Sequence, residues 1–184
     1  MSVHRGLRTP SVADSTRGLA GDAFKEVARE FPTGITVVAV RHHDSVTAKT
    51  VSSFTSLSLD PMLVTVAIGG GSPLVATAEE TEGFSVSILR ADQIAVSNFY
   101  AVHESHRGTS PPSRLVPVPS GGTVLDDCLG WFDCRLHGLI PAGDHAVLIG
   151  EVVSLQRNGG TPLVHHRGRY YGLDQDSPIS TLGR

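Results

Sequence analysis

Short apolar runs rich in β-branched residues recur along the chain, and they constrain its fold more than any other feature. Ile35–Val40, Met62–Ile68 and Ala146–Leu155 are apolar enough for strands buried on both faces. Phe84–Leu89 alternates apolar and polar residues, which predicts a strand with one buried face. Leu163–Tyr171 predicts the last strand of the domain.

A further strand is predicted between these runs, because Phe132, Cys134 and Leu136 alternate with polar residues. Asn158-Gly159-Gly160 is a hairpin signal between the last two strands. The stretch from 103 to 122 is rich in Pro, Ser and Gly and predicts a long loop.

The predicted helices are few and short. One begins at Asp22 and ends at Phe31, since a residue before proline disfavours the helical conformation. Ser72-Pro73 predicts the N-cap and first residue of a second helix, which closes at Gly83. A third starts at Asp92. Many strands joined by hairpins, with short helices, favour an antiparallel β-barrel over βαβ units.

Composition bounds the function. With 184 residues, 40% of them hydrophobic and 18% charged, the chain predicts one globular domain. We expect that domain to span 22–173, between flexible tails at 1–21 and 174–184. A formal charge of −3 with no dense basic stripe argues against nucleic acid or an anionic membrane surface as partner. The N-terminus lacks the apolar core of a secretory signal, so we expect a cytoplasmic protein.

The segment from Thr47 to Ser58 is rich in hydroxyl side chains and contains a single cation, Lys49. Hydroxyls and backbone N–H groups are the groups that hydrogen-bond the ribityl chain, phosphate and ring edge of a flavin. On composition alone, a Ser/Thr-rich loop is the favoured interpretation. No metal site is predicted: Cys128 and Cys134 match no zinc spacing, and His103 and His106 have no third ligand nearby.

Four sequence blocks decide between these interpretations. They are Phe31-Pro-Thr-Gly-Ile-Thr-Val-Val38, Thr50-Val-Ser-Ser-Phe-Thr-Ser-Leu-Ser-Leu-Asp-Pro61, Gly143-Asp-His145 with Ile149-Gly-Glu-Val152, and Pro162-Leu-Val-His-His-Arg-Gly-Arg-Tyr170. In this order and spacing they resemble the flavin reductase family, the reductase components of two-component flavin-dependent monooxygenases. The resemblance extends from about Phe24 to Leu173.

The resemblance implies a mainly β fold, an antiparallel six-stranded Greek-key split β-barrel with a few short flanking helices, acting as a homodimer. It implies an NAD(P)H-dependent flavin reductase that transfers hydride from NADH or NADPH to FAD, or alternatively FMN. The reduced flavin would pass to a partner monooxygenase. A non-catalytic flavin-binding or electron-carrier protein on the same barrel is the alternative.

The resemblance also implies site residues. His145 and His166 would lie on the nicotinamide side as catalytic residues. Ser72, at a helix N-terminus that offers free N–H donors, would approach the flavin phosphate. The full set of expected cofactor-binding residues is Thr33, Gly34, Lys49, Thr50, Val51, Ser52, Ser53, Ser56, Leu57, Ser58, Ser72, Phe99, His165, Arg167, Gly168, Arg169 and Tyr170.

Two departures from the family pattern bear on the flavin. Lys49 stands where an apolar residue is more common; it is either a solvated strand-edge lysine or a cation that steadies negative charge on the flavin. Ser72-Pro-Leu-Val75 keeps only the serine of the usual phosphate pattern. Together they favour FAD over FMN. Arg135, Arg167 and Arg169 would meet the 2′-phosphate of NADPH or face solvent, which leaves NADH and NADPH open.

Overall fold

The computed structural model describes residues 21–173, so the expected tails lie outside the described residues except for Gly21, which begins a helix. The chain divides into two compact units, residues 1–31 and 32–184. In the first unit, α1 (Gly21–Ala28) ends three residues before the predicted end at Phe31. No helix in the described range is long and apolar enough to cross a membrane.

The second unit is built on one antiparallel seven-stranded sheet, in the order β3-β2-β6-β9-β10-β5-β4. Its strands are β2 (Thr36–His42), β3 (Ser45–Val51), β4 (Thr55–Leu59), β5 (Met62–Gly69), β6 (Gly83–Ile88), β9 (Gly130–Ala142) and β10 (His145–Arg157). The prediction of a mainly β, antiparallel fold with few helices is confirmed.

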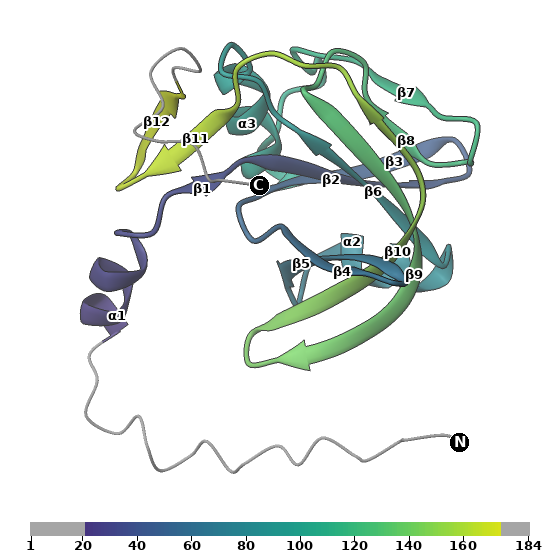
Figure 1. The fold of residues 1–184 in the computed structure, drawn as a ribbon, viewed down its shortest axis with the longest axis horizontal. Helices are drawn as coiled ribbons and strands as arrows, with labels where there is room; N and C mark the ends of the chain where they lie inside the picture. The colour runs from purple at the N-terminus through teal and green to yellow at the C-terminus, as the bar shows by residue number, and fades with distance from the viewer. Residues whose placement is uncertain (1–20, 174–184) are drawn as a thin grey trace. The chain divides into compact units, whose positions relative to one another are not determined.

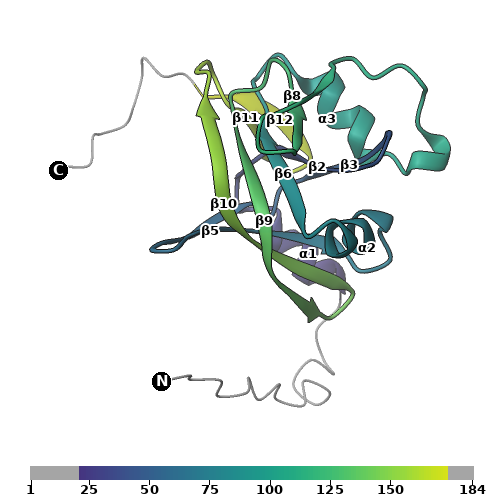
Figure 2. The same cartoon turned by 90° about the vertical axis from the view of Figure 1, so that its right-hand side faces the viewer.

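Strand β2 is buried on both faces because two cores meet at it. Val38 and Val40 belong to one core, which α2 (Pro73–Glu80) covers with Leu74, Val75 and Ala78. Val37 and Ala39 belong to the other, which α3 (Ile94–Ala101) covers with Val96 and Tyr100. Figure 2 shows the two helices on opposite sides of β2 and β3. Alternate side chains of one strand thus enter different cores.

The long strands β9 and β10 curve from the level of β6 to the level of β5 (Figure 1). Their pairing is shifted between Ile149 and Gly150 and between Val152 and Ser154, and such bulges bend a strand. The sheet has seven strands rather than six, and β3 and β4 are not hydrogen-bonded to each other. No closed barrel is therefore found among the described strands.

The prediction that β6 has one exposed face is wrong. Ser85 and Ser87 are as buried as Val86 between them, with at most 1% of each residue exposed. Their hydroxyls accept hydrogen bonds from the backbone N–H groups of Thr123 and Leu125 in β8 (Thr123–Leu125). The alternation therefore marks contact with a second strand rather than with solvent.

The prediction of one last strand over Leu163–Tyr171 is also wrong, because the chain turns back within it. β11 (Leu163–His166) and β12 (Arg169–Gly172) form a hairpin that pairs with β1 (Thr33–Gly34). Arg167 and Gly168 have φ of 48° and 75°, the positive values that a two-residue type I′ turn requires. β10 belongs to the seven-stranded sheet and β11 to the three-stranded sheet, and the two do not pair. Asn158-Gly159-Gly160 therefore connects two sheets and is not a hairpin turn.

Three smaller corrections concern connections. The hydroxyl-rich segment is not a loop: it forms β3 and β4, separated by residues 52–54. The predicted loop at 103–122 contains η1 (Glu104–His106) and β7 (Leu115–Pro117), and β7 pairs with β8. Helix α2 ends at Glu80 rather than near Gly83, because the chain turns at Glu82 with φ of 53°.

Candidate flavin-binding site

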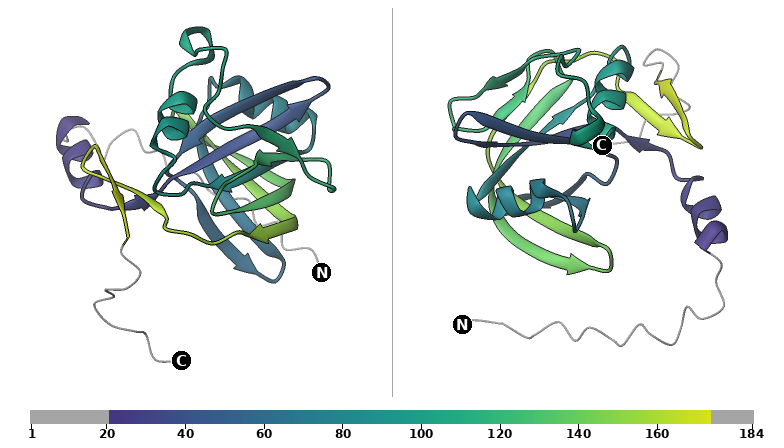
Figure 3. Two further views of the ribbon diagram at one scale, coloured as in Figure 1. Left: turned by 90° about the horizontal axis from the view of Figure 1, so that it is seen from above. Right: turned by 180° about the vertical axis from the view of Figure 1, so that it is seen from behind.

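Three segments that are distant in sequence meet through a chain of hydroxyl groups. The Thr50 hydroxyl donates to the Ser97 carbonyl at 2.7 Å, and the Ser97 hydroxyl lies 2.9 Å from the Tyr170 hydroxyl. Tyr170 donates in turn to Asn98 Oδ1 at 3.0 Å. We call these four residues the Thr50–Tyr170 cluster. It ties β3 and β12 to α3, and Figure 3 shows the β11–β12 hairpin beside α3 in both views.

The β1–β11 pairing adds two more predicted residues to this region. Thr33 is opposite His165, and Gly34 is opposite Val164. The His165 ring is 5.7 Å from the Tyr170 ring at an interplanar angle of 62°. The structure therefore brings Thr33, His165 and Tyr170 together, and Tyr170 is joined to Thr50 through Ser97.

Beside β3 there is a cavity of about 330 Å³, which we call the Lys49 cavity. Lys49 and Ser72 both line it, as do Gly69–Gly71, residues 101–104, Arg107 and Asp144. Ser72 is the N-cap of α2, Pro73 follows it, and the Ser72 hydroxyl makes no capping hydrogen bond. An ammonium and an uncommitted hydroxyl at a helix N-terminus are groups that bind an anion.

Arg107 also lines the Lys49 cavity, although its sequence context gave no reason to expect it there. Its Nη2 donates to the carbonyls of Ala48 and Val102, both at 3.0 Å, and its guanidinium lies over the Phe99 and Tyr100 rings. Arg107 thereby holds the segment after α3 against β3. Its Nε is buried and has no partner among the described residues. Phe99, expected at the flavin, lies beneath this guanidinium.

The two histidines assigned to catalysis are separated within the chain. His145 begins β10 opposite Gly69, and its Nδ1 lies 2.8 Å from Asp144 Oδ1. The hydrogen bond from His145 and its charge hold the pKa of Asp144 below the usual range. His166 lies in the β11–β12 hairpin beside Tyr171. Figures 1 and 2 place the β9–β10 turn and this hairpin in different parts of the unit.

The remaining expected residues have varied settings. Val51 is buried in a core, so only its backbone is available to a ligand. The Ser53 hydroxyl donates to the Ala67 carbonyl and accepts from the Ala67 N–H. Exposed or partly exposed positions are taken by Ser52, Ser56, Leu57, Ser58, Arg167, Gly168 and Arg169. Leu57 lies at a bulge between Ser56 and Ser58.

The arrangement supplies hydroxyl groups and two cations rather than an acid–base pair. No group of three or more potential metal ligands is found among residues 21–173. Donors for a polyhydroxylated chain and donors for an anion both lie along β3. This combination is suited to a phosphorylated ligand that crosses the β3 edge.

Comparison with known proteins shows which family, and so which class of ligand, this arrangement belongs to. A family model described as a flavin reductase like domain matches residues 28–174. The chain belongs to the flavin reductase family. One relative in it is the NADH-dependent FMN reductase AsuE2 of Streptomyces nodosus subsp. asukaensis, with 36% identity over 94% of this chain and 98% of the relative.

Two further members of the flavin reductase family are informative. The reductase component of 4-hydroxyphenylacetate 3-monooxygenase from Thermus thermophilus is 35% identical over 83% of this chain and 96% of its own. The NADH:FAD oxidoreductase SgcE6 of Streptomyces globisporus C-1027, solved in complex with NAD and FAD fragments, has 27% identity. It superposes with a TM-score of 0.77 over 84% of this chain and 93% of that one.

Proposed function

We propose that this chain is an NAD(P)H-dependent flavin reductase that supplies reduced flavin to a partner monooxygenase. One observation carries the proposal beyond family membership. The residues expected at the flavin phosphate, Lys49 and Ser72, line one cavity, and the next residue along β3, Thr50, joins the cluster expected at the flavin ring.

The residues fit a flavin nucleotide. Lys49 and the N-terminus of α2 would hold the phosphate, with Arg107 fixing the opposite wall of the cavity. Thr33, Gly34, Thr50 and Ser52 would contact the ribityl chain and the ring. Val51 would contribute only through its backbone, since its side chain belongs to a core.

The nicotinamide and flavin carry out hydride transfer by their own chemistry when both are bound. What the protein contributes is orientation: the two rings must be held face to face and competing geometries excluded. The hydroxyl cluster around Tyr170 and the paired strands β1 and β11 fix the site by backbone and side-chain hydrogen bonds. This role requires no strong protein base. His145 and His166 remain candidates for the nicotinamide side.

FAD is the preferred flavin in this proposal, with FMN the alternative. The preference rests on Lys49 and on the shortened phosphate pattern of Ser72-Pro-Leu-Val75, since two carboxylates, Glu104 and Asp144, line the cavity beside its two cations. The cosubstrate is NADH or NADPH, and the exposed Arg167 and Arg169 are the candidates for a 2′-phosphate contact.

The proposal includes the finer description of the fold as a Greek-key split barrel and of the enzyme as a homodimer. In its favour, the Ser53 hydroxyl, in the connection between β3 and β4, exchanges two hydrogen bonds with Ala67 of β5 and so extends the β4–β5 pairing toward β3. Exposed apolar side chains on β4 and β5 favour self-association. Two buried free cysteines agree with a cytoplasmic location.

The test is oxidation of NADH and of NADPH, followed by absorbance, with FAD, FMN and riboflavin each added in turn. We expect turnover that requires flavin and proceeds fastest with FAD. Reduced flavin should be recovered from solution, so that a separate oxygenase can use it. A chain that binds flavin and leaves both nicotinamides unoxidised would be the electron-carrier alternative.

A further inference from the structure

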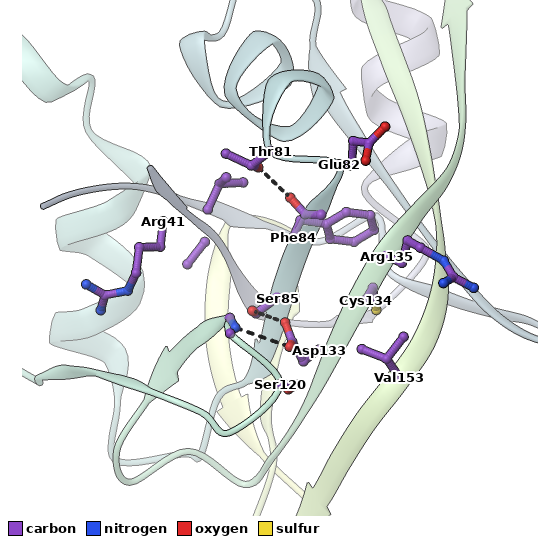
Figure 4. A pocket seen from close by; sticks show the side chains of 15 residues that line it. Arg41, Thr81, Glu82, Phe84, Ser85, Ser120, Asp133, Cys134, Arg135 and Val153 are labelled. Carbon is purple, nitrogen blue, oxygen red and sulfur yellow. Dashed lines mark hydrogen bonds between the residues drawn. The ribbon is translucent and has the colours of Figure 1, made fainter. Parts of the chain in front are cut away.

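A second cavity, of about 430 Å³, lies outside the flavin site, and we call it the Asp133 cavity (Figure 4). Strands β2, β6, β9 and β10 and the turn between β7 and β8 bound it. Of the residues considered for flavin or nicotinamide, only Arg135, one of three candidates for the 2′-phosphate of NADPH, lines it. It is larger than the Lys49 cavity, and the proposed flavin chemistry makes no use of it.

Asp133 is a buried carboxylate on the wall of this cavity, with 5% of the residue exposed. Oδ1 accepts a hydrogen bond from the Ser85 hydroxyl at 2.7 Å, and Oδ2 accepts a longer one, 3.3 Å, from the Gly122 N–H. Both donors are uncharged. A carboxylate has about four acceptor positions, so about two remain unused.

The basic side chains around the cavity do not neutralise Asp133. Figure 4 shows the Arg41 and Arg135 guanidinium groups on opposite sides, both pointing away from the Asp133 carboxylate. Arg41 donates to the Thr123 hydroxyl at 3.1 Å, and Arg135 is paired with Glu151 at 2.9 Å. Within residues 21–173 no salt bridge to Asp133 is present. A buried charge without a counterion is unfavourable.

The backbone at Gly122 packs closely against the Asp133 side chain. A Cβ at position 122 would collide with the Asp133 carboxylate and the Ser85 hydroxyl, so only glycine allows this approach. Glu82 lines the cavity with φ of 53°, a conformation that non-glycine residues rarely adopt. Val153 lies at the β9–β10 bulge and also lines the cavity. Bulges and positive φ values concentrate at functional sites.

We propose that the Asp133 cavity binds a small organic cation, a protonated amine attached to an apolar body. The ammonium group would donate to the unused acceptor positions of Asp133 and supply the missing counter-charge. The apolar body would pack against Phe84 and Val153. An anion would be repelled where it meets Asp133, and a neutral compound leaves the buried charge uncompensated.

Benzylamine is the probe, titrated calorimetrically into the full chain, with benzyl alcohol and benzoate as neutral and anionic compounds of similar shape. We expect saturable binding of one benzylamine per chain at millimolar concentration and no saturable binding of the other two. Asp133→Asn, which preserves side-chain size, should weaken benzylamine binding at least about tenfold, since a charge-assisted hydrogen bond is lost. Flavin reduction by this variant should be unchanged.

Two further variants protect the test against a folding defect in Asp133→Asn. Val153→Phe keeps the carboxylate but fills the cavity, and it should also abolish benzylamine binding. Lys49→Met, in the other cavity, should leave benzylamine binding intact. The proposal is overturned if wild type shows no saturable binding, if Val153→Phe binds as wild type does, or if Lys49→Met loses the amine. The outcome is independent of whether the chain reduces flavin.

Discussion

Among single side chains, Lys49 provides the most direct test of the flavin-phosphate site. Its ammonium shares a cavity with the N-terminus of α2. We expect Lys49→Met to weaken FAD and FMN binding about tenfold, the usual size of one charge-assisted hydrogen bond at a partly exposed site. Riboflavin, which has no phosphate, should bind as before. Fluorescence titration of the three flavins measures this.

Lys25 is the matched control for Lys49, since it lies on α1 in an exposed pair with Asp22. Lys25→Met should change no flavin affinity. Equal weakening of riboflavin and FAD by Lys49→Met would contradict the phosphate role and place the ammonium near the ring. Unchanged affinity for all three flavins would make Lys49 a solvated surface residue.

Cys134 illustrates how burial controls reactivity. Burial, with a smaller contribution from the neighbouring Asp133 charge, raises the pKa of its thiol to about 12. The thiolate is the reactive form, and at pH 8 only about one Cys134 thiol in ten thousand is ionised, so its reaction is slow. We expect iodoacetamide to leave Cys134 unmodified in the folded protein at pH 8 and to modify it after denaturation, as measured by mass spectrometry of the peptides.

The same pKa gives a stability prediction with a definite sign. The native pKa of Cys134 lies above that of the unfolded chain, near 9, so its contribution to stability is complete below pH 9. That contribution is lost as the pH rises from about 9 to about 12. Thermal unfolding of Cys134→Ala, compared with wild type across this range, should show a smaller decline. Parallel declines would contradict the assigned pKa.

Sequence reasoning at the residue scale selected residues that the structure brings into two groups. Lys49 and Ser72 line one cavity, Thr50 and Tyr170 belong to one hydrogen-bonded cluster, and their contact with flavin stays a prediction. Ser97, Asn98 and Arg107 were not foreseen. A serine and an asparagine within an apolar helix have no distinguishing spacing, and Arg107 acts through backbone carbonyls whose positions only the fold defines.

At the scale of elements, the β11–β12 hairpin depends on the Tyr170 hydroxyl. That hydroxyl bonds to Asn98 Oδ1 and to the fully buried Ser97 hydroxyl, so Tyr170→Phe leaves Ser97 short of a partner. We expect a loss of about 1–2 kcal/mol in the free energy of unfolding, measured by urea denaturation. Tyr171→Phe is the control, because the neighbouring Tyr171 is 46% exposed. Equal effects of the two variants would contradict the tie between hairpin and helix.

Element prediction failed where one pattern is compatible with two environments. The serines of β6 alternate as they would on a solvated face, yet β8, which is distant in sequence, covers them. In the last segment, Arg167-Gly168 interrupts a continuous strand pattern with only one glycine, and the positive φ at Arg167 has no sequence signal of its own. The apolar runs of β2 and β5 were both predicted as strands, but only β2 is buried on both faces. In β5 alternate residues, Val64, Val66 and Ile68, are buried, so the prediction of two buried faces was wrong there.

At the scale of the whole molecule, antiparallel architecture could be predicted because it follows from short strands and few helices. The number of strands could not. The hydroxyl-rich β3 and β4 have little apolar character, since both are edge strands of the seven-stranded sheet. An edge strand is hydrogen-bonded on one side only and is free to contain polar residues. The segment from Thr47 to Ser58 therefore pointed most clearly to a flavin site, and yet its sequence gave the least indication of strands.

The exposed apolar side chains on β4 and β5 yield the last prediction. Leu57, Leu59 and Met62 are 50%, 90% and 51% exposed, and contiguous exposed apolar surface marks an interaction site. As a homodimer the protein should have twice the 19.4 kDa mass of one chain by light scattering. Leu59→Asp should shift it to monomer, because burying a carboxylate in an apolar interface is unfavourable, whereas Leu59→Met should remain dimeric. If the flavin lies near that interface, the monomer should also bind FAD more weakly. A monomeric wild type would contradict the homodimer. An Asp variant that is monomeric and binds FAD with unaltered affinity would show that the flavin site does not depend on the interface.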